Sequence, residues 1–200
     1  EQPEGGVARA AGGRGEVMYG TRMWHTDGSD NPVRALGSLV CGREVPLEGA
    51  ETEFASVRAG YDELPDEEKD RLEGLVAIHD FSYSRGLVDP NLINEKHQAE
   101  TPPVRQAVIR TNPANGRKAF YSGSHASHVI GWPVEEGRAM MKGLVEKAVQ
   151  PERVYAHKWQ QYDLVIWDNR CILHRGRPWD KSRYRRVMHR TTVAGAGPTA

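Results

Sequence analysis

The chain has 200 residues, and its 27 Lys and Arg side chains balance its 27 Asp and Glu side chains, so its formal net charge is zero. Without net charge there is no global field to attract nucleic acid or an anionic membrane surface. No apolar run approaches the roughly 18 residues that span a bilayer, and the N-terminus lacks a signal-peptide pattern. We therefore expect one domain, 1–200, with nucleic acid and membrane excluded as partners.

The first part of the chain predicts a lead-in followed by two strands. Residues 1–16 are rich in Gly, Ala and Arg without apolar periodicity, which favours a loop or poorly ordered segment. Strands are expected at Glu16–Asp27 and Ala35–Val45. Because the chain begins with Glu1 rather than Met, we expect it not to be a complete gene product.

The middle of the chain mixes helices, a hairpin and an irregular segment. Asp66–His79 has acidic residues in its first turn and apolar residues at helical spacing, which predicts a helix. Residues 82–103 contain three prolines and no periodic core, as in a mobile lid or a plain surface loop. Val104–Thr111 and Arg117–Ser122 predict a hairpin, and Pro133–Gln150 predicts the clearest helix.

The last part of the chain predicts four strands. They are Arg153–Trp159, Asp163–Trp167, Cys171–His174 and Arg185–Val193. Many short strands with one or two helices are typical of a mostly β, jelly-roll (cupin-like) barrel. The two cysteines, Cys41 and Cys171, lie in apolar, strand-like context and predict reduced thiols in a cytoplasmic protein.

One short motif predicts metal binding. His25 and Asp27 are two residues apart, and on a strand such residues point to the same face. The pair could offer an imidazole and a carboxylate to one ion, with a third ligand from elsewhere. His174 lies 174 − 25 = 149 residues later. Two His and one carboxylate form the facial triad of non-haem Fe(II) oxygenases, although H-x-D alone is a weak signal.

A basic run after His174 predicts an anion site. On a strand, Arg186, Met188 and Arg190 would share one face. Two guanidiniums inside a barrel are costly unless each meets an anion, and Arg is suited to bidentate carboxylate recognition. The pattern therefore predicts a dicarboxylate clamp. A nucleic-acid patch is the weaker reading, since only Trp179 and Tyr184 are interleaved.

The remaining histidines leave an alternative open. His125 and His128 have the i, i+3 spacing that could bind a metal on a helix, and they compete with the H-x-D motif. His79 is expected to cap or pack a helix end. The segment Trp167–Arg170 is expected to be scaffold, a buried aromatic with polar groups that fix the turn before the His174 strand.

Five segments together resemble one enzyme family in the family's order. They are W-H-T-D at 24–27, G-A-E-T-E-F-A-S-V-R-A-G-Y-D at 49–62, G-S-H-A-S-H at 123–128, D-L-V-I-W-D-N-R-C-I-L-H-R-G at 163–176 and R-R-V-M-H-R-T-T-V at 185–193. The chain resembles the Fe(II)/2-oxoglutarate dioxygenases of the taurine dioxygenase and phenoxyacetate dioxygenase (TauD/TfdA) family. The resemblance implies a double-stranded β-helix and a single catalytic dioxygenase domain.

The resemblance also implies a role for each candidate residue. His25, Asp27 and His174 would hold Fe(II) and form the catalytic centre. Thr52 and Arg186 would bind 2-oxoglutarate. The substrate-binding residues would be Arg190, His125 and His128.

The reaction that the resemblance implies consumes 2-oxoglutarate as cosubstrate and O₂, and releases succinate and CO₂. It would hydroxylate a small anionic organic substrate, a carboxylate, sulfonate or sulfate, with either stable hydroxylation or cleavage as the result. A homo-oligomer stays open.

Two departures from the family pattern matter. Only 23 residues precede Trp24, so the N-terminal part of the family domain is expected to be absent, and Gly28-Ser29-Asp30 is unusually polar. The alternatives are a catalytically inactive barrel that binds a metal and a small acid, and a Zn²⁺ hydrolase. A hydrolase would have no use for a dicarboxylate clamp.

Overall fold

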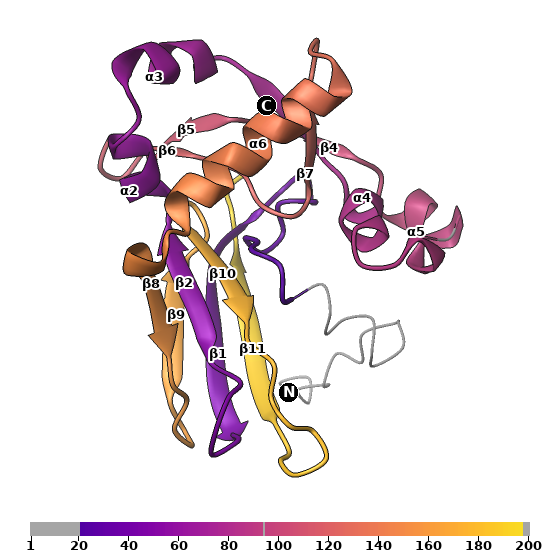
Figure 1. The fold of residues 1–200 in the computed structure, drawn as a ribbon, viewed down its shortest axis with the longest axis vertical. Coiled ribbons are helices and arrows are strands. Elements are labelled where there is room, and N and C mark those ends of the chain that lie inside the picture. The colour runs from indigo at the N-terminus through magenta and orange to yellow at the C-terminus, as the bar shows by residue number, and fades with distance from the viewer. Residues whose placement is uncertain (1–20, 94, 198–200) are drawn as a thin grey trace.

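The computed structural model describes residues 21–93 and 95–197, which form a mostly β structure with short helices (Figure 1). The strands are β1 Ala35–Glu44, β2 Thr52–Ser56, β3 Val76–His79, β4 Val104–Ala107, β5 Ile109–Thr111, β6 Lys118–Phe120, β7 Ala126–Val129, β8 Val154–His157, β9 Leu164–Asp168, β10 Ile172–Gly176 and β11 Val187–Ala194. The helices are α2 Val57–Asp62, α3 Asp66–Leu72, α4 Phe81–Gly86, η1 Pro90–Leu92, α5 Glu95–Glu100, α6 Val134–Ala148 and η2 Pro151–Arg153.

Two antiparallel sheets occupy the lower part of Figure 1, and in one of them β1, from early in the described residues, pairs with β11, from late in them. One sheet has the order β11-β1-β9 and the other the order β10-β2-β8. Phe54 of β2 and Trp167 of β9 meet with ring centroids 5.4 Å apart, so the sheets share a packed inner space. The His174 ring lies 4.7 Å from that of Trp167. Packing between the sheets therefore places this histidine.

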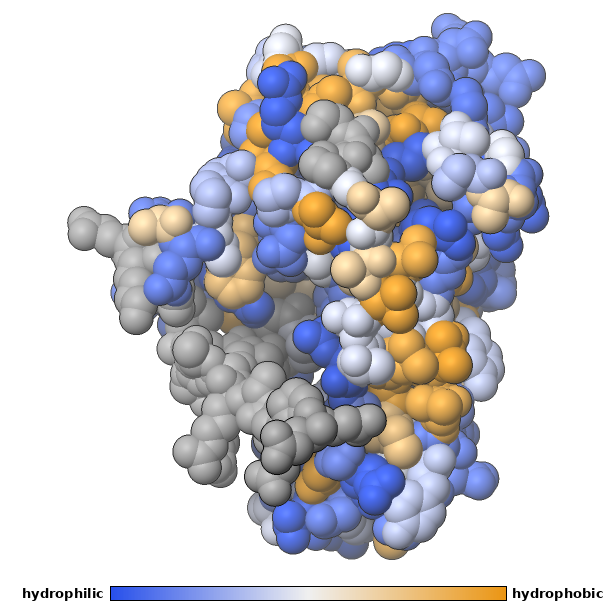
Figure 2. Space-filling model, turned by 180° about the vertical axis from the view of Figure 1, so that it is seen from behind, coloured by the Kyte–Doolittle hydropathy of each residue, from blue (hydrophilic) through white to orange (hydrophobic). Residues whose placement is uncertain are grey.

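Strand β9 shows the alternation that a half-buried strand requires. Trp167 is buried, whereas Leu164 and Ile166 are 59% and 63% exposed. Figure 2 shows the molecule from behind, so that β8 and β9, at the left in Figure 1, come to lie on its right side. A hydrophobic area lies on that side.

The main core lies under α6, which crosses the upper part of the molecule in Figure 1. Met141 and Leu144 of α6 are each 1% exposed, and they join Phe120 and Val129 in one buried cluster. At Gly137 a Cβ atom would lie only 2.7 Å from the backbone nitrogen of Val129. The missing side chain therefore lets α6 lie directly on β7.

Several predicted elements are confirmed within a few residues. The predicted strand at 35–45 is β1, and the predicted helix at 133–150 is α6, with Pro133 as its N-cap. The predicted hairpin is confirmed for β5 and β6, with Ile109 paired to Phe120, whereas the first half of its predicted first strand is β4, which pairs with β3 in another sheet. The four C-terminal strands are β8 to β11, and neither cysteine forms a disulfide. None of the helices in residues 21–93 and 95–197 is long and apolar enough to cross a bilayer.

The helix predicted over Asp66–His79 is wrong in its second half. The helix ends at Leu72, and Val76–His79 forms strand β3. Gly74 has φ +76°, the left-handed conformation that ends helices. The β-branched Val76 and Ile78 then favour a strand. His79 consequently lies within a sheet and is 0% exposed, rather than capping a helix.

Three further predictions need correction. Of the strand predicted over Glu16–Asp27, residues 21–27 contain only an isolated bridge at His25, and residues 16–20 lie outside the described residues, as does the predicted lead-in 1–16. Residues 82–103 contain parts of short helices rather than a plain loop. His128 lies on strand β7 and His125 just before it, so the pair is not helical.

Candidate metal centre

His25 and His174 lie side by side although 149 residues separate them in the sequence. Each backbone N–H donates to the other residue's carbonyl, at 3.1 Å from His25 and 2.8 Å from His174. This single antiparallel bridge brings the ring centroids within 4.2 Å of each other. A continuous strand through His25 is therefore unnecessary, because one bridge aligns the two imidazoles.

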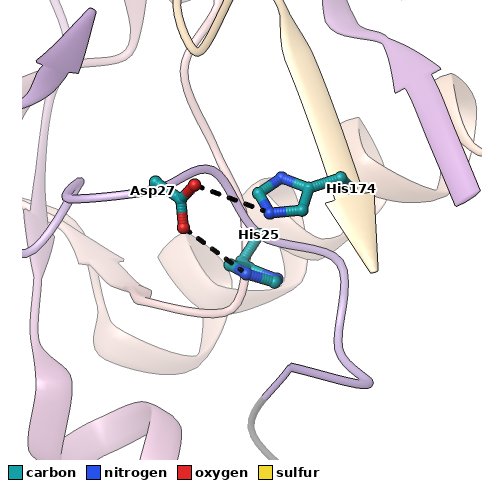
Figure 3. Close-up of side chains that lie close together, drawn as sticks. All are labelled: His25, Asp27 and His174. Atoms are coloured by element: carbon teal, nitrogen blue, oxygen red, sulfur yellow. Dashed lines mark ion pairs between the residues drawn. The ribbon is translucent and has the colours of Figure 1, made fainter. Parts of the chain in front are cut away.

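Asp27 completes the group from the same short segment (Figure 3). Its Oδ1 lies 4.0 Å from His25 Nε2, and its Oδ2 lies 3.7 Å from His174 Nε2. One ligand atom from each residue falls within 4.8 Å of the other two. Two atoms bound at about 2.1 Å at a right angle are about 3 Å apart, so small side-chain rotations suffice for one ion to reach all three. No second such group of three is found in the described part of the chain.

The protonation states suit metal binding. Burial lowers the pKa of His25, and it lowers that of His174 to about 3, so both rings are neutral at neutral pH. The His25 Nδ1 atom lies 2.8 Å from the Met23 carbonyl oxygen, which favours a proton on Nδ1 and leaves the Nε2 lone pair toward Asp27. Burial alone would raise the pKa of Asp27, but His174 and His25 in their protonated forms, the charge of Arg190 and the hydrogen bond from Ser38 hold it below its usual range.

A buried hydrogen-bond network orients the Asp27 carboxylate. The Ser38 hydroxyl donates to Asp27 Oδ2 at 2.6 Å, and the Asn169 amide donates to Ser38 Oγ at 2.8 Å. The Asn169 Oδ1 atom accepts from Trp167 Nε1 at 3.0 Å and from the Asp27 backbone N–H at 3.3 Å. Ser38 is 0% and Asn169 1% exposed. Outer partners of this kind fix the orientation of metal ligands.

Sequence reasoning missed Ser38 and assigned Asn169 only to the turn before the His174 strand. Their contacts with Asp27 span 11 and 142 residues. The only indication in the sequence was that Asn169 is a polar residue between Trp167 and a predicted strand, where a buried amide needs a hydrogen-bond partner.

Arg190 lies against the metal ligands. Its Nη1 donates to Asp27 Oδ1 at 2.8 Å, and its side chain is 58% exposed. Asp27 is an acidic partner within the chain itself. A guanidinium has five N–H donors, so one bond to Asp27 leaves others for a second anion.

Arg186 lies just before β11 and has no anionic partner among the described residues. Its Nε atom is buried and makes no hydrogen bond, and burial lowers the pKa of the guanidinium. Its Cζ atom lies 5.3 Å from the centre of the Trp179 ring. Arg186 is half-buried, and a guanidinium N–H that is shielded from water without a partner is costly unless a ligand supplies the acceptor.

Thr52 lies at the start of β2, and Trp159 links it to the region of Arg186. The Trp159 indole N–H donates to Thr52 Oγ1 at 3.0 Å. Gly42 of β1 packs against Trp159, since a Cβ there would lie 3.2 Å from the indole ring. Gly42 in turn pairs with Met188, two residues after Arg186.

The structure separates the two histidines of the 123–128 motif. The His125 ring stacks on Phe81 with the ring centroids 6.1 Å apart, and the N–H of Ser124, just before it, donates to the carbonyl of Trp24 at 2.9 Å. Burial lowers the pKa of His125 to about 4, against the raising effect of the nearby Asp30 and Asp27 carboxylates. His125 therefore lies near the metal ligands, and its Nδ1 is buried without a hydrogen-bond partner. His128 instead contacts the Ser127 hydroxyl through Nδ1 at 2.8 Å.

A cleft of about 730 Å³ has none of the candidate metal ligands in its walls. It is lined by Trp24, Ser124 and Arg175, the sequence neighbours of His25, His125 and His174, together with residues of α6. Since adjacent strand residues point to opposite faces, Arg175 and His174 face different sides of β10. The cleft and the candidate metal centre are thus distinct.

The order of motifs, the three converging ligands and the half-buried Arg186 agree with a family assignment by sequence comparison. Residues 4–192 match the model of the Taurine catabolism dioxygenase TauD, TfdA family, and the chain belongs to that family. It is 40% identical over 190 residues to an alpha-ketoglutarate-dependent 2,4-dichlorophenoxyacetate dioxygenase of Burkholderia sp. (strain RASC), covering 95% of this chain and 64% of the relative. A protein of the same name from Cupriavidus pinatubonensis is 43% identical over 178 residues, covering 89% and 62%.

Solved structures agree with the fold. The crystal structure of AAD-2 in complex with Mn(II) and N-oxalylglycine superposes with a TM-score of 0.88 at 43% identity, covering 93% of this chain and 73% of that one. With 64% and 62% of their lengths covered, the chain spans less than two thirds of each of the two curated relatives described above.

Proposed function

We propose that this chain carries the metal centre and the cosubstrate site of an Fe(II)- and 2-oxoglutarate-dependent dioxygenase. The observation that carries the proposal is the convergence of His25, Asp27 and His174 within 4.8 Å. Two neutral imidazoles and one carboxylate suit a divalent iron ion and leave its remaining positions open. The two relatives described above are dioxygenases of this kind by name.

The chain's own residues would prepare the ion and its ligands. His25 and His174 offer Nε2 lone pairs, and Ser38 and Asn169 hold the ionised carboxylate of Asp27 in place. When bound, Fe(II) supplies the oxygen-activating chemistry that couples oxidation of 2-oxoglutarate, to succinate and CO₂, to hydroxylation of a C–H bond.

Arg186 is the proposed partner of the distal carboxylate of 2-oxoglutarate, with the hydroxyl of Thr52 as a second donor. One support is the buried Nε of Arg186, which has no hydrogen-bond partner among the described residues. The other is Trp159, which donates to Thr52 and packs against Gly42 of β1, the strand that pairs with β11 after Arg186. N-oxalylglycine, present in the AAD-2 crystal structure, has the same two carboxylates as 2-oxoglutarate.

The proposed primary substrate is a small organic anion, with aryloxyalkanoates as the favoured class. This class follows from the substrate in the names of the two relatives. Arg190 would contact the substrate's carboxylate with the N–H groups that Asp27 does not occupy. His125 is close enough to the ligands to line the same space. His128 is retained as a substrate contact only through the family resemblance.

The two facing sheets are proposed to be parts of a double-stranded β-helix, with residues 1–200 contributing to one catalytic domain. The support is the antiparallel order of each sheet and the contact between Phe54 and Trp167.

Succinate formation tests the proposed function. We expect the protein, supplied with Fe(II), O₂ and 2-oxoglutarate, to form succinate faster when 2,4-dichlorophenoxyacetate is added. A panel of sulfonates, alkyl sulfates and neutral amides would define the substrate class. Metal binding without succinate would favour the inactive barrel, and hydrolysis without 2-oxoglutarate would favour a zinc hydrolase.

A further inference from the structure

A second cluster of charge lies beside the residues that lead into β10, Arg170 and Cys171. Nine residues line a small pocket there, five of them arginines and none of them Asp or Glu. The arginines come from the start of β1, from α2, from the β5–β6 hairpin and from the β9–β10 turn: Arg34, Arg58, Arg110, Arg117 and Arg170. Sequence analysis singled out none of them as a site.

Two of these arginines are neutralised by the chain itself. Arg170 makes three hydrogen bonds to the Asp168 carboxylate, at 2.7 to 3.1 Å. Arg117 pairs with Asp62. Neither of these two acidic residues lines the pocket, so both arginines are paired on the side away from it.

Arg34 and Arg110 are not neutralised in this way. The Nε of Arg34 and both Nη atoms of Arg110 are buried without a hydrogen-bond partner among the described residues. The Arg110 guanidinium lies over the Tyr121 ring, 4.2 Å from its centre, which is worth only about 0.5–2 kcal/mol. Burial and the charge of Arg34 lower the pKa of Arg110 to about 10, so the guanidinium stays charged at neutral pH.

The Arg34 and Arg110 side chains are half-buried, and guanidinium N–H groups that are shielded from water without a partner favour an oxygen anion with planar or tetrahedral faces. The enclosed volume of about 10 Å³ matches roughly one water-sized sphere. One oxygen of an anion can therefore enter while the rest of the anion stays at the mouth. An organic molecule with a bulky body does not fit inside.

We propose that Arg34 and Arg110 form a binding site for a small inorganic oxyanion, sulfate or phosphate, separate from the metal centre. Cys171, in the pocket wall, is three residues from His174, roughly 10 Å along a strand. A bound anion would tie together β1, α2, the β5–β6 hairpin and the turn that carries Asn169. It would stabilise the scaffold that holds Asp27 without contacting the ion.

The test is equilibrium binding of radiolabelled sulfate and of phosphate, paired with thermal unfolding at constant ionic strength. We expect saturable binding of one anion per chain, with a Kd on the order of 1 mM or tighter, and a rise in Tm over the same range. Arg110→Met and Arg34→Met should each weaken binding roughly tenfold or more. Because they remove N–H groups that are shielded from water without a partner, neither should lower Tm in sulfate-free buffer.

Two controls separate this site from general charge and from the cosubstrate site. Arg105→Met removes one exposed positive charge outside the pocket and should leave sulfate binding unchanged. Arg186→Met should also retain it. Absence of saturable binding, an equal loss in Arg105→Met, or a loss in Arg186→Met with retention in Arg110→Met would each overturn the proposal. Each result is independent of whether 2-oxoglutarate is consumed.

Discussion

Asp27 is a buried charge and Arg186 a half-buried one, and the chain surrounds them in opposite ways. The Asp27 carboxylate meets Ser38, Arg190 and two imidazoles. The Arg186 guanidinium has a buried Nε without any partner among the described residues. The first centre is organised by the protein before any ligand arrives, whereas the second needs an anion from outside. Under the proposed function, the difference means that the candidate metal ligands are held in place by the protein, whereas the Arg186 site is completed by the cosubstrate.

Removing a metal ligand should have the largest effect. His174→Ala deletes one of three ligands, and we expect Fe(II) or Mn(II) affinity to fall by at least about 100-fold, the upper end of the cost of changing outer partners alone. Titration calorimetry measures the loss. His189→Ala, an exposed histidine on β11, is the matched control. Unchanged affinity in His174→Ala would refute the ligand assignment.

The second test addresses Arg186, whose Nε has no partner among the described residues. Arg186→Lys keeps the charge but loses the planar fork, so affinity for 2-oxoglutarate should fall by about 1–3 kcal/mol. Arg185→Lys, next to it and paired with Glu44, should leave that affinity unchanged. If both variants bind 2-oxoglutarate like the parent chain, the carboxylate partner lies elsewhere.

Ser38→Ala weakens the preorganisation of Asp27 without touching a ligand. It removes the donor to Asp27 Oδ2 and leaves the Asn169 amide without its acceptor. Metal affinity should fall by roughly 10-fold, while the affinity for 2-oxoglutarate at saturating metal should change little. Ser182→Ala, on an exposed turn, serves as control. A purely structural role for Ser38 would lower Tm and leave metal affinity intact.

Much of this comparison follows from sequence patterns, and the rest depends on long-range contacts. The spacing of His25, Asp27 and His174 and the order of the motifs predict the ligands. Strand periodicity also places β1 and β10. Periodicity does not reveal that the His25 segment pairs through a single bridge, because that depends on the partner strand.

The errors have local or distant physical causes. Apolar spacing continues past Leu72, so the helix was expected to reach His79, yet the left-handed Gly74 ends it. The contact between Arg190 and Asp27 spans 163 residues and no local pattern encodes it. For the same reason the network of Ser38 and Asn169 could not be predicted.

A smaller effect is expected from a buried imidazole that no charge compensates. Burial lowers the pKa of His79 to about 3, below the roughly 6.5 of the unfolded chain. The folded state then binds fewer protons below pH 6.5, so this part of the stability is present above that pH and lost as pH falls. The loss should be about 1.4 kcal/mol at one pH unit below 6.5.

Denaturant unfolding of the parent chain and of His79→Phe, each at about one unit above and one unit below pH 6.5, measures this loss as the difference between the two pH dependences, because the other buried imidazoles contribute to both. His79→Phe should remove it, since the aromatic contact with Tyr121 can remain without a titrating group. His189→Ala should leave the pH dependence unchanged. The same pH dependence in His79→Phe as in the parent chain would contradict the assignment.

The smallest effect is expected at Arg190, which is 58% exposed. Arg190→Met keeps the bulk of the stem and should raise the KM for an anionic substrate by a few-fold, the equivalent of up to about 1 kcal/mol for an exposed pair. The KM for 2-oxoglutarate should stay nearly constant. Equal reaction of acids and neutral amides in the parent chain would remove the proposed substrate role.

Dependence of 2-oxoglutarate binding on the metal tests the central claim most directly. Calorimetric titration of 2-oxoglutarate into the protein without O₂ should show weak binding alone and tight, one-to-one binding once Mn(II) or Fe(II) is added. His174→Ala should abolish that enhancement, and Arg186→Lys should weaken binding while retaining it. Equal affinity with and without metal would contradict a shared site formed by His25, Asp27, His174 and Arg186.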